Sequence, residues 1–118
     1  MPEIRQQTTD NRELKVVGEI RNLYNILFPI FKKRKDYFLW QHGLKSLISV
    51  GSNLTEGNKR SKKEQLYFIS IAEGSMAEFE FQLSLMKIVI QCNDLIDKIK
   101  AMIYKLKSAV RNRKSEVG

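Results

Sequence analysis

Apolar residues recur every three or four positions along four stretches of the chain, at about residues 13–28, 37–57, 62–91 and 94–114. This spacing is that of one face of an α-helix. The third stretch is the most regular, because its main apolar stripe runs without interruption from Ile69 to Ile90. No segment shows the apolar and polar alternation of a half-buried strand bounded by turns. The pattern therefore predicts an all-α protein with four helices.

Residues that begin or end helices support these bounds. Ser61 and Glu64 have the spacing of a capping box, and Asp36 is a candidate N-cap for the second helix. Pro29 is expected to end the first helix, because proline cannot donate the helical hydrogen bond. The connections between the stretches are short, which favours antiparallel neighbours. We therefore expect residues 1–118 to form one domain, an up-down-up-down four-helix bundle.

Composition and charge narrow the class of protein. The 118 residues include 21 Lys and Arg against 13 Asp and Glu, for a net charge of +8, and 42% are apolar, which is enough for one packed core. The single cysteine, Cys92, excludes a disulfide framework and a cysteine-rich metal site, and favours a reducing, cytoplasmic location. No apolar stretch approaches the length of a membrane span or the core of a signal peptide.

The positive charge is segregated along the chain. Residues 29–63 carry +7 and residues 98–118 carry +6, whereas residues 64–97 carry −5. In the expected topology, the connection between the second and third helices lies at the same end as the last part of the fourth. The candidate nucleic-acid-binding residues of this region are Lys59, Arg60, Lys62, Lys63, Lys105, Arg111, Arg113 and Lys114. A second basic cluster, expected at the opposite end, comprises Lys32, Lys33, Arg34 and Lys35.

A basic cluster of this size has two interpretations. Each Lys or Arg that neutralises a phosphate releases counterions, so the cluster could bind RNA or DNA without reading its sequence. A solvated, lysine-rich face that promotes solubility is the alternative.

Several polar or small residues interrupt the apolar stripes of the second and third helices. We expect a structural polar cluster formed by Asn53, Glu56, Gly74, Ser75 and Glu78. A glycine inside a long helix costs about 1 kcal/mol relative to alanine, which indicates a close helix approach at Gly74. A partly buried Glu78 would need hydrogen-bonding partners. If the hairpin is centred near residue 60, Ser46 faces Gly74 and His42 approaches Glu78.

The same region carries a family resemblance. The segments SVGSNLTEG at 49–57, RSKKE at 60–64 and FISIAEGSMAE at 68–78 resemble the four-helix-bundle proteins encoded by intervening sequences in bacterial 23S ribosomal RNA genes. The resemblance implies a bundle that assembles into a homo-pentamer, no known catalysis, and a role discussed as nucleic-acid or ribosome-related. Related bundles serve as accessory proteins of diversity-generating retroelements, which bind a reverse transcriptase and nucleic acid.

Standard catalytic frameworks are missing from the sequence. It contains no phosphate-binding Gly-Lys-Ser/Thr loop, His-Glu-x-x-His helix, Cys-x-x-Cys pair or Gly-x-Ser-x-Gly elbow, so we expect no enzyme, cofactor or metal site. One histidine without a second nitrogen ligand makes a poor metal site. An enzyme built on His42 and Glu78 would require both side chains to open into a solvent-accessible pocket. The aromatic residues interpreted as core rather than as base-stacking surface are Tyr67, Phe68, Phe79 and Phe81.

The leading interpretation is a non-enzymatic, homo-oligomeric four-helix bundle in the cytoplasm. Its basic surface is expected to bind RNA or DNA through phosphate contacts, with low sequence selectivity. The alternative is an adaptor or scaffold whose oligomer docks a protein, for example a reverse transcriptase, with nucleic acid secondary.

Overall fold

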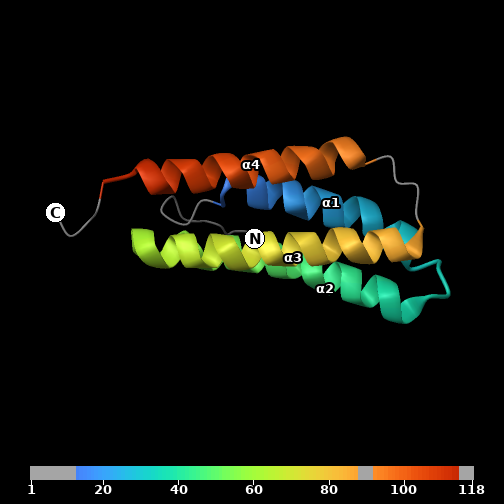
Figure 1. Ribbon diagram of the computed structural model, residues 1–118. Coiled ribbons are helices and arrows are strands. Elements are labelled where there is room, and N and C mark those ends of the chain that lie inside the picture. The colour runs from blue at the N-terminus through green and yellow to red at the C-terminus, as the bar shows by residue number, and fades with distance from the viewer. Residues whose placement is uncertain (1–12, 88–91, 115–118) are drawn as a thin grey trace, which may run out of the picture.

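The computed structural model describes residues 13–87 and 92–114, and within these ranges the chain forms four α-helices and no strand. The helices are α1 (Lys15–Phe31), α2 (Tyr37–Gly57), α3 (Lys62–Met86) and α4 (Asn93–Asn112). Figure 1 shows that consecutive helices run in opposite directions. Each helix packs against the next, and α4 returns to lie beside α1, which closes the bundle. The predicted all-α bundle is confirmed.

The core is formed by the apolar stripes that the sequence pattern marks. On α3, the stripe from Ile69 through Phe79 to Met86 is buried, as predicted. The largest side chains with almost no exposed surface are Phe31, Phe79, Leu23, Leu27, Leu47, Leu54, Ile69, Ile99 and Val50. Burying one such side chain stabilises the fold by about 1.5–3 kcal/mol. The four stripes together therefore hold the bundle closed.

Two helix ends differ from prediction. Helix α1 continues through Pro29 to Phe31, because a proline near a helix end removes only one hydrogen bond, while the extra turn buries Phe31 completely. Helix α3 ends at Met86 rather than near residue 91, and Lys87 adopts the left-handed conformation, with φ 53° and ψ 37°. The remaining predicted part of this helix, residues 88–91, lies outside the described residues.

The start of α3 has the predicted cap. The Ser61 hydroxyl accepts a hydrogen bond from the backbone N–H of Glu64 at 3.3 Å, and it donates one to the Glu64 carboxylate at 3.2 Å. One of the backbone N–H groups that a helix start leaves unpaired is thereby satisfied. The cap fixes where the turn after α2 ends, and so helps to position the charged residues in that turn.

Helices α2 and α3 pack together most closely, in a register that differs from prediction. Ser46 donates a hydrogen bond to the side-chain oxygen of Gln82 at 2.9 Å, instead of facing Gly74. The reason lies at the end of α2, where a Cβ atom on Gly57 would be 2.8 Å from the Cβ of Phe68. The end of α2 therefore lies level with the second turn of α3, and the first turn of α3 projects beyond it.

The close approach expected at Gly74 is wrong. Gly74 is exposed, and apart from its own turns of α3 no atom of the described residues lies within 4 Å of the position that a Cβ would occupy there. The glycine that permits a close approach is Gly57, which is buried against α3. Gly74 instead lies on the outer face of α3, where the described chain leaves open space.

Candidate nucleic-acid interface

The turn between α2 and α3 lies beside the end of α4. The Lys62 ammonium donates to the backbone carbonyl of Arg113 at 2.8 Å, and the Arg113 guanidinium donates to the side-chain oxygen of buried Gln65 at 3.0 Å. These two bonds join Lys62 and Gln65, at the start of α3, to Arg113, which is 51 and 48 positions away from them in sequence. Together they bring seven basic residues to one end of the molecule, which we call the basic end: Lys59, Arg60, Lys62, Lys63, Arg111, Arg113 and Lys114.

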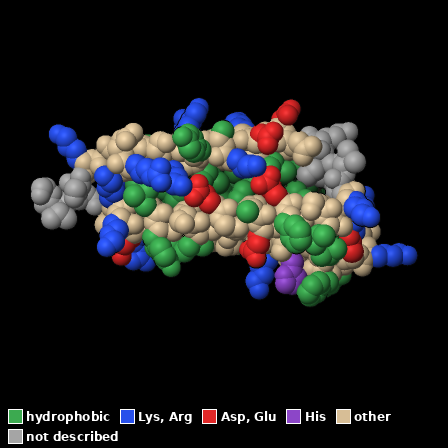
Figure 2. All heavy atoms as spheres, in the orientation of Figure 1, with side chains coloured by type: hydrophobic (Ala, Val, Ile, Leu, Met, Phe, Trp, Pro, Cys, Tyr) green, Lys and Arg blue, Asp and Glu red, His purple; other side chains and the backbone are tan. Residues whose placement is uncertain are grey.

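Four residues of the basic end have charges that are not compensated by any partner among the described residues. Their side chains are exposed and make no hydrogen bond or ion pair within residues 13–87 and 92–114; we call Lys59, Lys63, Arg111 and Lys114 the free cations. Figure 2 shows Lys and Arg side chains gathered toward the end where α4 finishes, and acidic side chains mostly nearer the middle of this face. The free cations therefore leave positive charge at this end of the molecule available to an anion.

Arg60 belongs to the basic end but is already engaged. Its Nε donates to the Glu56 carboxylate at 2.9 Å, and a second, shorter bond joins the same two side chains. Its guanidinium also lies 5.6 Å from the centre of the Phe68 ring. The hydrogen bond to Glu56 raises the pKa of Arg60. Arg60 therefore fixes the end of α2, and its charge is largely compensated there.

Lys105 does not join the basic end. It lies two helical turns before the end of α4, where it lines a shallow hollow with Lys15 and the apolar side chains of Leu14 and Leu106. The hollow lies between α1 and α4, on the side of the bundle away from the turn between α2 and α3. The topology brings the end of α4 to that turn, but the rotation of the helix directs Lys105 elsewhere.

The predicted polar cluster is assembled only in part. The Asn53 amide donates to the backbone oxygen and the hydroxyl of Ser49, at 2.9 and 3.2 Å, and that hydroxyl lies 2.8 Å from the hydroxyl of Ser75. Asn53 and Ser75 are therefore joined through a residue that the prediction omitted. Glu56 lies apart, at the end of α2. The expected partial burial of Glu78 is wrong, because this carboxylate is exposed on the outer face of α3.

Sequence reasoning missed two polar residues between α2 and α3: Ser49, which joins Asn53 to Ser75, and Gln82, which accepts from Ser46. Gln82 takes the place in front of Ser46 that was expected for Gly74. The spacing of Ser75 and Gln82 is a signal that could have identified Gln82. The two residues are seven positions apart and so lie on one face of a helix. Nothing in the sequence alone showed which turn of α2 that face would meet.

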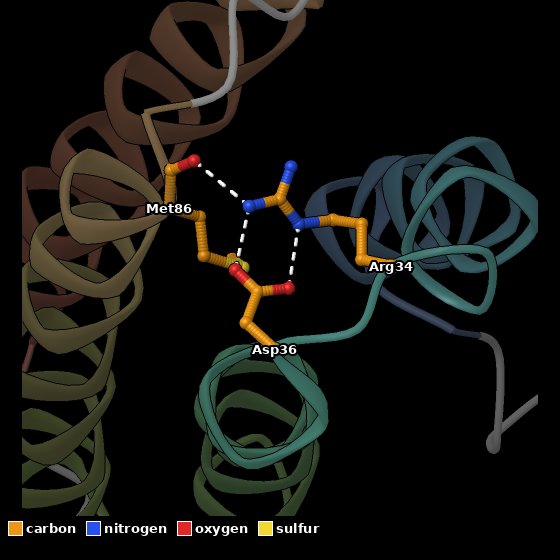
Figure 3. A network of polar contacts seen from close by, with 3 residues as sticks. All are labelled: Arg34, Asp36 and Met86. Carbon is orange, nitrogen blue, oxygen red and sulfur yellow. Dashed lines mark hydrogen bonds and ion pairs between the residues drawn. The ribbon is translucent and has the colours of Figure 1, made fainter.

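The second basic cluster contains a structural arginine. Arg34 donates through Nε to one Asp36 carboxylate oxygen at 2.8 Å and through Nη2 to the other, and Nη2 also donates to the backbone oxygen of Met86 at 2.9 Å (Figure 3). It thereby ties the turn after α1 to the Met86 carbonyl in the last turn of α3, where carbonyls lose their helical partners. The hydrogen bond from Arg34 lowers the pKa of Asp36. Asp36 is at the N-cap position of α2, but its side chain makes no cap hydrogen bond.

The aromatic residues that were interpreted as core divide into two groups. Phe79 is fully buried, and Phe68 is half-buried. Tyr67 and Phe81 are 64% and 62% exposed, so their interpretation as core is wrong. With Leu85, which is 47% exposed, they lie on the same outward stripe of α3 as Gly74. A periodic pattern does not distinguish a core stripe from an apolar stripe that faces outward.

The candidate catalytic pair, His42 and Glu78, is not brought together in the structure. His42 is exposed, with its ring 4.4 Å from that of Phe38, and it lines a groove to which Glu78 does not contribute. The two residues therefore do not share a pocket. Cys92 is buried, and desolvation raises the pKa of its thiol, which disfavours the reactive thiolate.

The described residues offer neither a metal-binding cluster nor a membrane-spanning helix. No group of three or more His, Cys, Asp or Glu side chains there is placed to hold a metal ion. None of the four described helices combines the length and the apolar character needed to cross a membrane.

The family model described as 23S rRNA-intervening sequence protein matches residues 12–112, which is most of the chain. No curated protein and no solved structure matches the chain significantly. The matched range includes all four helices and the hydrogen bonds that join α2 to α3. The description refers to an intervening sequence of 23S rRNA and names no reaction.

Proposed function

The chain belongs to the 23S rRNA-intervening sequence protein family, and on that premise we propose that it is a non-enzymatic, homo-oligomeric cytoplasmic protein that binds RNA or DNA phosphates at its basic end. The observation that carries the proposal is the set of four free cations, gathered at one end of the bundle by the contacts of Lys62 and Arg113. Exposed lysine and arginine side chains of this kind each contact one phosphate.

The charge balance of the basic end supports an anionic ligand. Within residues 13–87 and 92–114, its seven cations are accompanied by two carboxylates, Glu56 and Glu64, and Glu56 is bound by Arg60. The free cations lie in the turn before α3, in the first turn of α3 and at the end of α4, rather than along one helix that could enter a groove and contact base edges. Phosphate contacts position a nucleic acid without reporting its sequence. The binding that we propose is therefore non-specific and sensitive to salt.

The outer face of α3 supports self-association. Tyr67, Phe81 and Leu85 leave large apolar side chains in water, and Gly74 lies between them with open space around it. A glycine in a helix costs about 1 kcal/mol relative to alanine, and no contact within the described chain accounts for it here. A second copy packed on this face would cover the apolar side chains and approach closely at Gly74. Closed symmetry would then repeat the basic end and give avidity.

Binding to duplex DNA and RNA across a salt series tests the proposed function. With the nuclease-treated protein, we expect the logarithm of the affinity for duplex DNA to fall linearly with the logarithm of salt concentration. The expected slope is about −3 to −4 for each subunit in contact, because each phosphate neutralised by a free cation contributes about −0.9. Light scattering on the same sample gives the number of copies.

The same samples distinguish the adaptor alternative. If no nucleic acid binds at low salt, while a protein partner is retained after nuclease treatment, the protein is an adaptor and the basic end serves solubility. That result would refute the proposed function.

A further inference from the structure

A groove of about 470 Å³ lies between α1 and α2, near the end of the bundle opposite the basic end. Tyr24 and Phe28 line it from α1, and Trp40, Leu44 and Lys45 line it from α2. None of its lining residues is acidic. The proposed phosphate contacts at the basic end leave this groove without a role.

The groove has an aromatic wall. The rings of Tyr24 and Phe28 are stacked, with their centres 6.0 Å apart and their planes within 9°. Phe28 meets Trp40 edge-on, with ring centres 6.5 Å apart, and Tyr37 meets Trp40 in the same manner at 5.1 Å. Phe28 is 38% exposed, although it is a large apolar side chain. The wall therefore leaves the Phe28 ring partly exposed to a ligand in the groove.

Positive charge surrounds this wall. The Lys32 ammonium lies 5.8 Å from the centre of the Phe28 ring, and Lys45 lines the groove itself. Lys33 and Lys35 follow in the turn, and within the described residues their side chains make no ion pair. Asp36, the carboxylate of the same turn, is bound by Arg34. An apolar protein segment in this groove would leave these ammonium groups uncompensated.

We propose that the groove holds an unpaired base of single-stranded RNA or DNA. The base would stack on Phe28, while Lys32 and Lys45 would contact the phosphates on either side. A single strand matches both features of the site, because it combines flat aromatic rings with a negative backbone, and aromatic side chains beside cations are how proteins bind such strands. This inference rests on the proposed function, and it adds a preference for unpaired over paired nucleic acid.

Trp40 provides a direct readout, because it is the only tryptophan of the chain and it lines the groove. We would titrate the full, nuclease-treated chain with a short oligothymidylate and with an abasic oligomer carrying the same number of phosphates. Both are expected to bind with a salt-dependent affinity. Only the oligothymidylate should change the fluorescence of Trp40, and it should bind about fivefold or more tightly than the abasic strand.

The variant Phe28→Leu sharpens the test, because leucine keeps the apolar bulk and removes the aromatic face. We expect it to lower the affinity for oligothymidylate by about fivefold or more, toward that of the abasic strand. Tyr104→Leu is the matched control, since Tyr104 is 67% exposed on α4 and does not line the groove. Thermal melting of both variants establishes that they are folded. The comparison of the two strands on the unaltered chain does not depend on either variant.

The outcomes separate this inference from the proposed function. Salt-dependent binding of both strands with equal affinity, and no change in Trp40 fluorescence, would overturn the proposal that the groove holds a base. Such a result would leave the proposed phosphate binding at the basic end unaffected. Absence of binding by either strand would overturn both proposals. A change in Trp40 fluorescence with protein concentration, without nucleic acid, would show that a second copy covers the groove and would also overturn this inference.

Discussion

Replacing all four free cations with glutamine is expected to reduce the salt dependence of duplex DNA binding by about three to four units of slope. Each free cation that contacts a phosphate releases counterions, so the removal of four contacts removes most of the electrostatic driving force. At about 0.1 M salt, the affinity should fall by up to about three orders of magnitude. The measurement is the salt series applied to the variant Lys59→Gln, Lys63→Gln, Arg111→Gln and Lys114→Gln.

A second variant with the same change in net charge provides the control. It replaces four lysines away from the basic end with glutamine: Lys15, Lys87, Lys98 and Lys100. Lys98 and Lys100 form ion pairs with Glu19 and Glu80 at the surface, and such pairs contribute little to stability. We expect this variant to keep most of the slope. An equal loss in both variants would mean that overall charge, and not the basic end, governs binding.

Gly74→Arg is expected to dissociate the proposed oligomer into folded single chains. Apart from the surrounding turns of α3 itself, no atom of the described residues lies within 4 Å of a Cβ at this position, so the arginine can extend into solvent without disturbing the bundle. In an assembly that packs on the outer face of α3, the same side chain would separate the copies and bury an unpaired charge. The affinity for long nucleic acids should fall at the same time, because avidity is lost.

Light scattering and thermal melting together test this prediction. Ala101→Arg is the matched control, because Ala101 is an exposed residue within α4 and is not on the α3 face. An unchanged mass for Gly74→Arg would place the interface elsewhere. A lower melting temperature with an unchanged number of copies would show that Gly74 serves the fold of the single chain.

The parts of the fold that the sequence predicts are those set by local pattern. The stripe from Ile69 to Met86 is buried because its period matches the helix, and Ser61 caps α3 because its hydroxyl reaches a backbone group three residues away. The end of α1 was mispredicted because the loss of a helical hydrogen bond at Pro29 is outweighed by the burial of Phe31, which is a tertiary contact. Periodicity also left open whether Phe81 faced the core or solvent.

The parts of the candidate site that could not be predicted depend on how two helices meet. Ser46 pairs with Gln82 because the close contact at Gly57 sets the register of α2 against α3. No local sequence pattern encodes that register. In the sequence, Arg34 is one of four consecutive basic residues. Its structural role depends on the end of α3, which only the fold brings beside it. The contact between Arg60 and Glu56 was predictable, because the two residues are one helical turn apart.

The measurement that tests the central claim most directly is the protection of individual lysines from acetylation by bound duplex DNA. Mass spectrometry reports the reaction of each lysine in the free and bound protein. We expect Lys59, Lys63 and Lys114 to be protected, while Lys87 and Lys98 react as in the free protein. Uniform protection of all five, or protection confined to Lys87 and Lys98, would contradict binding at the basic end.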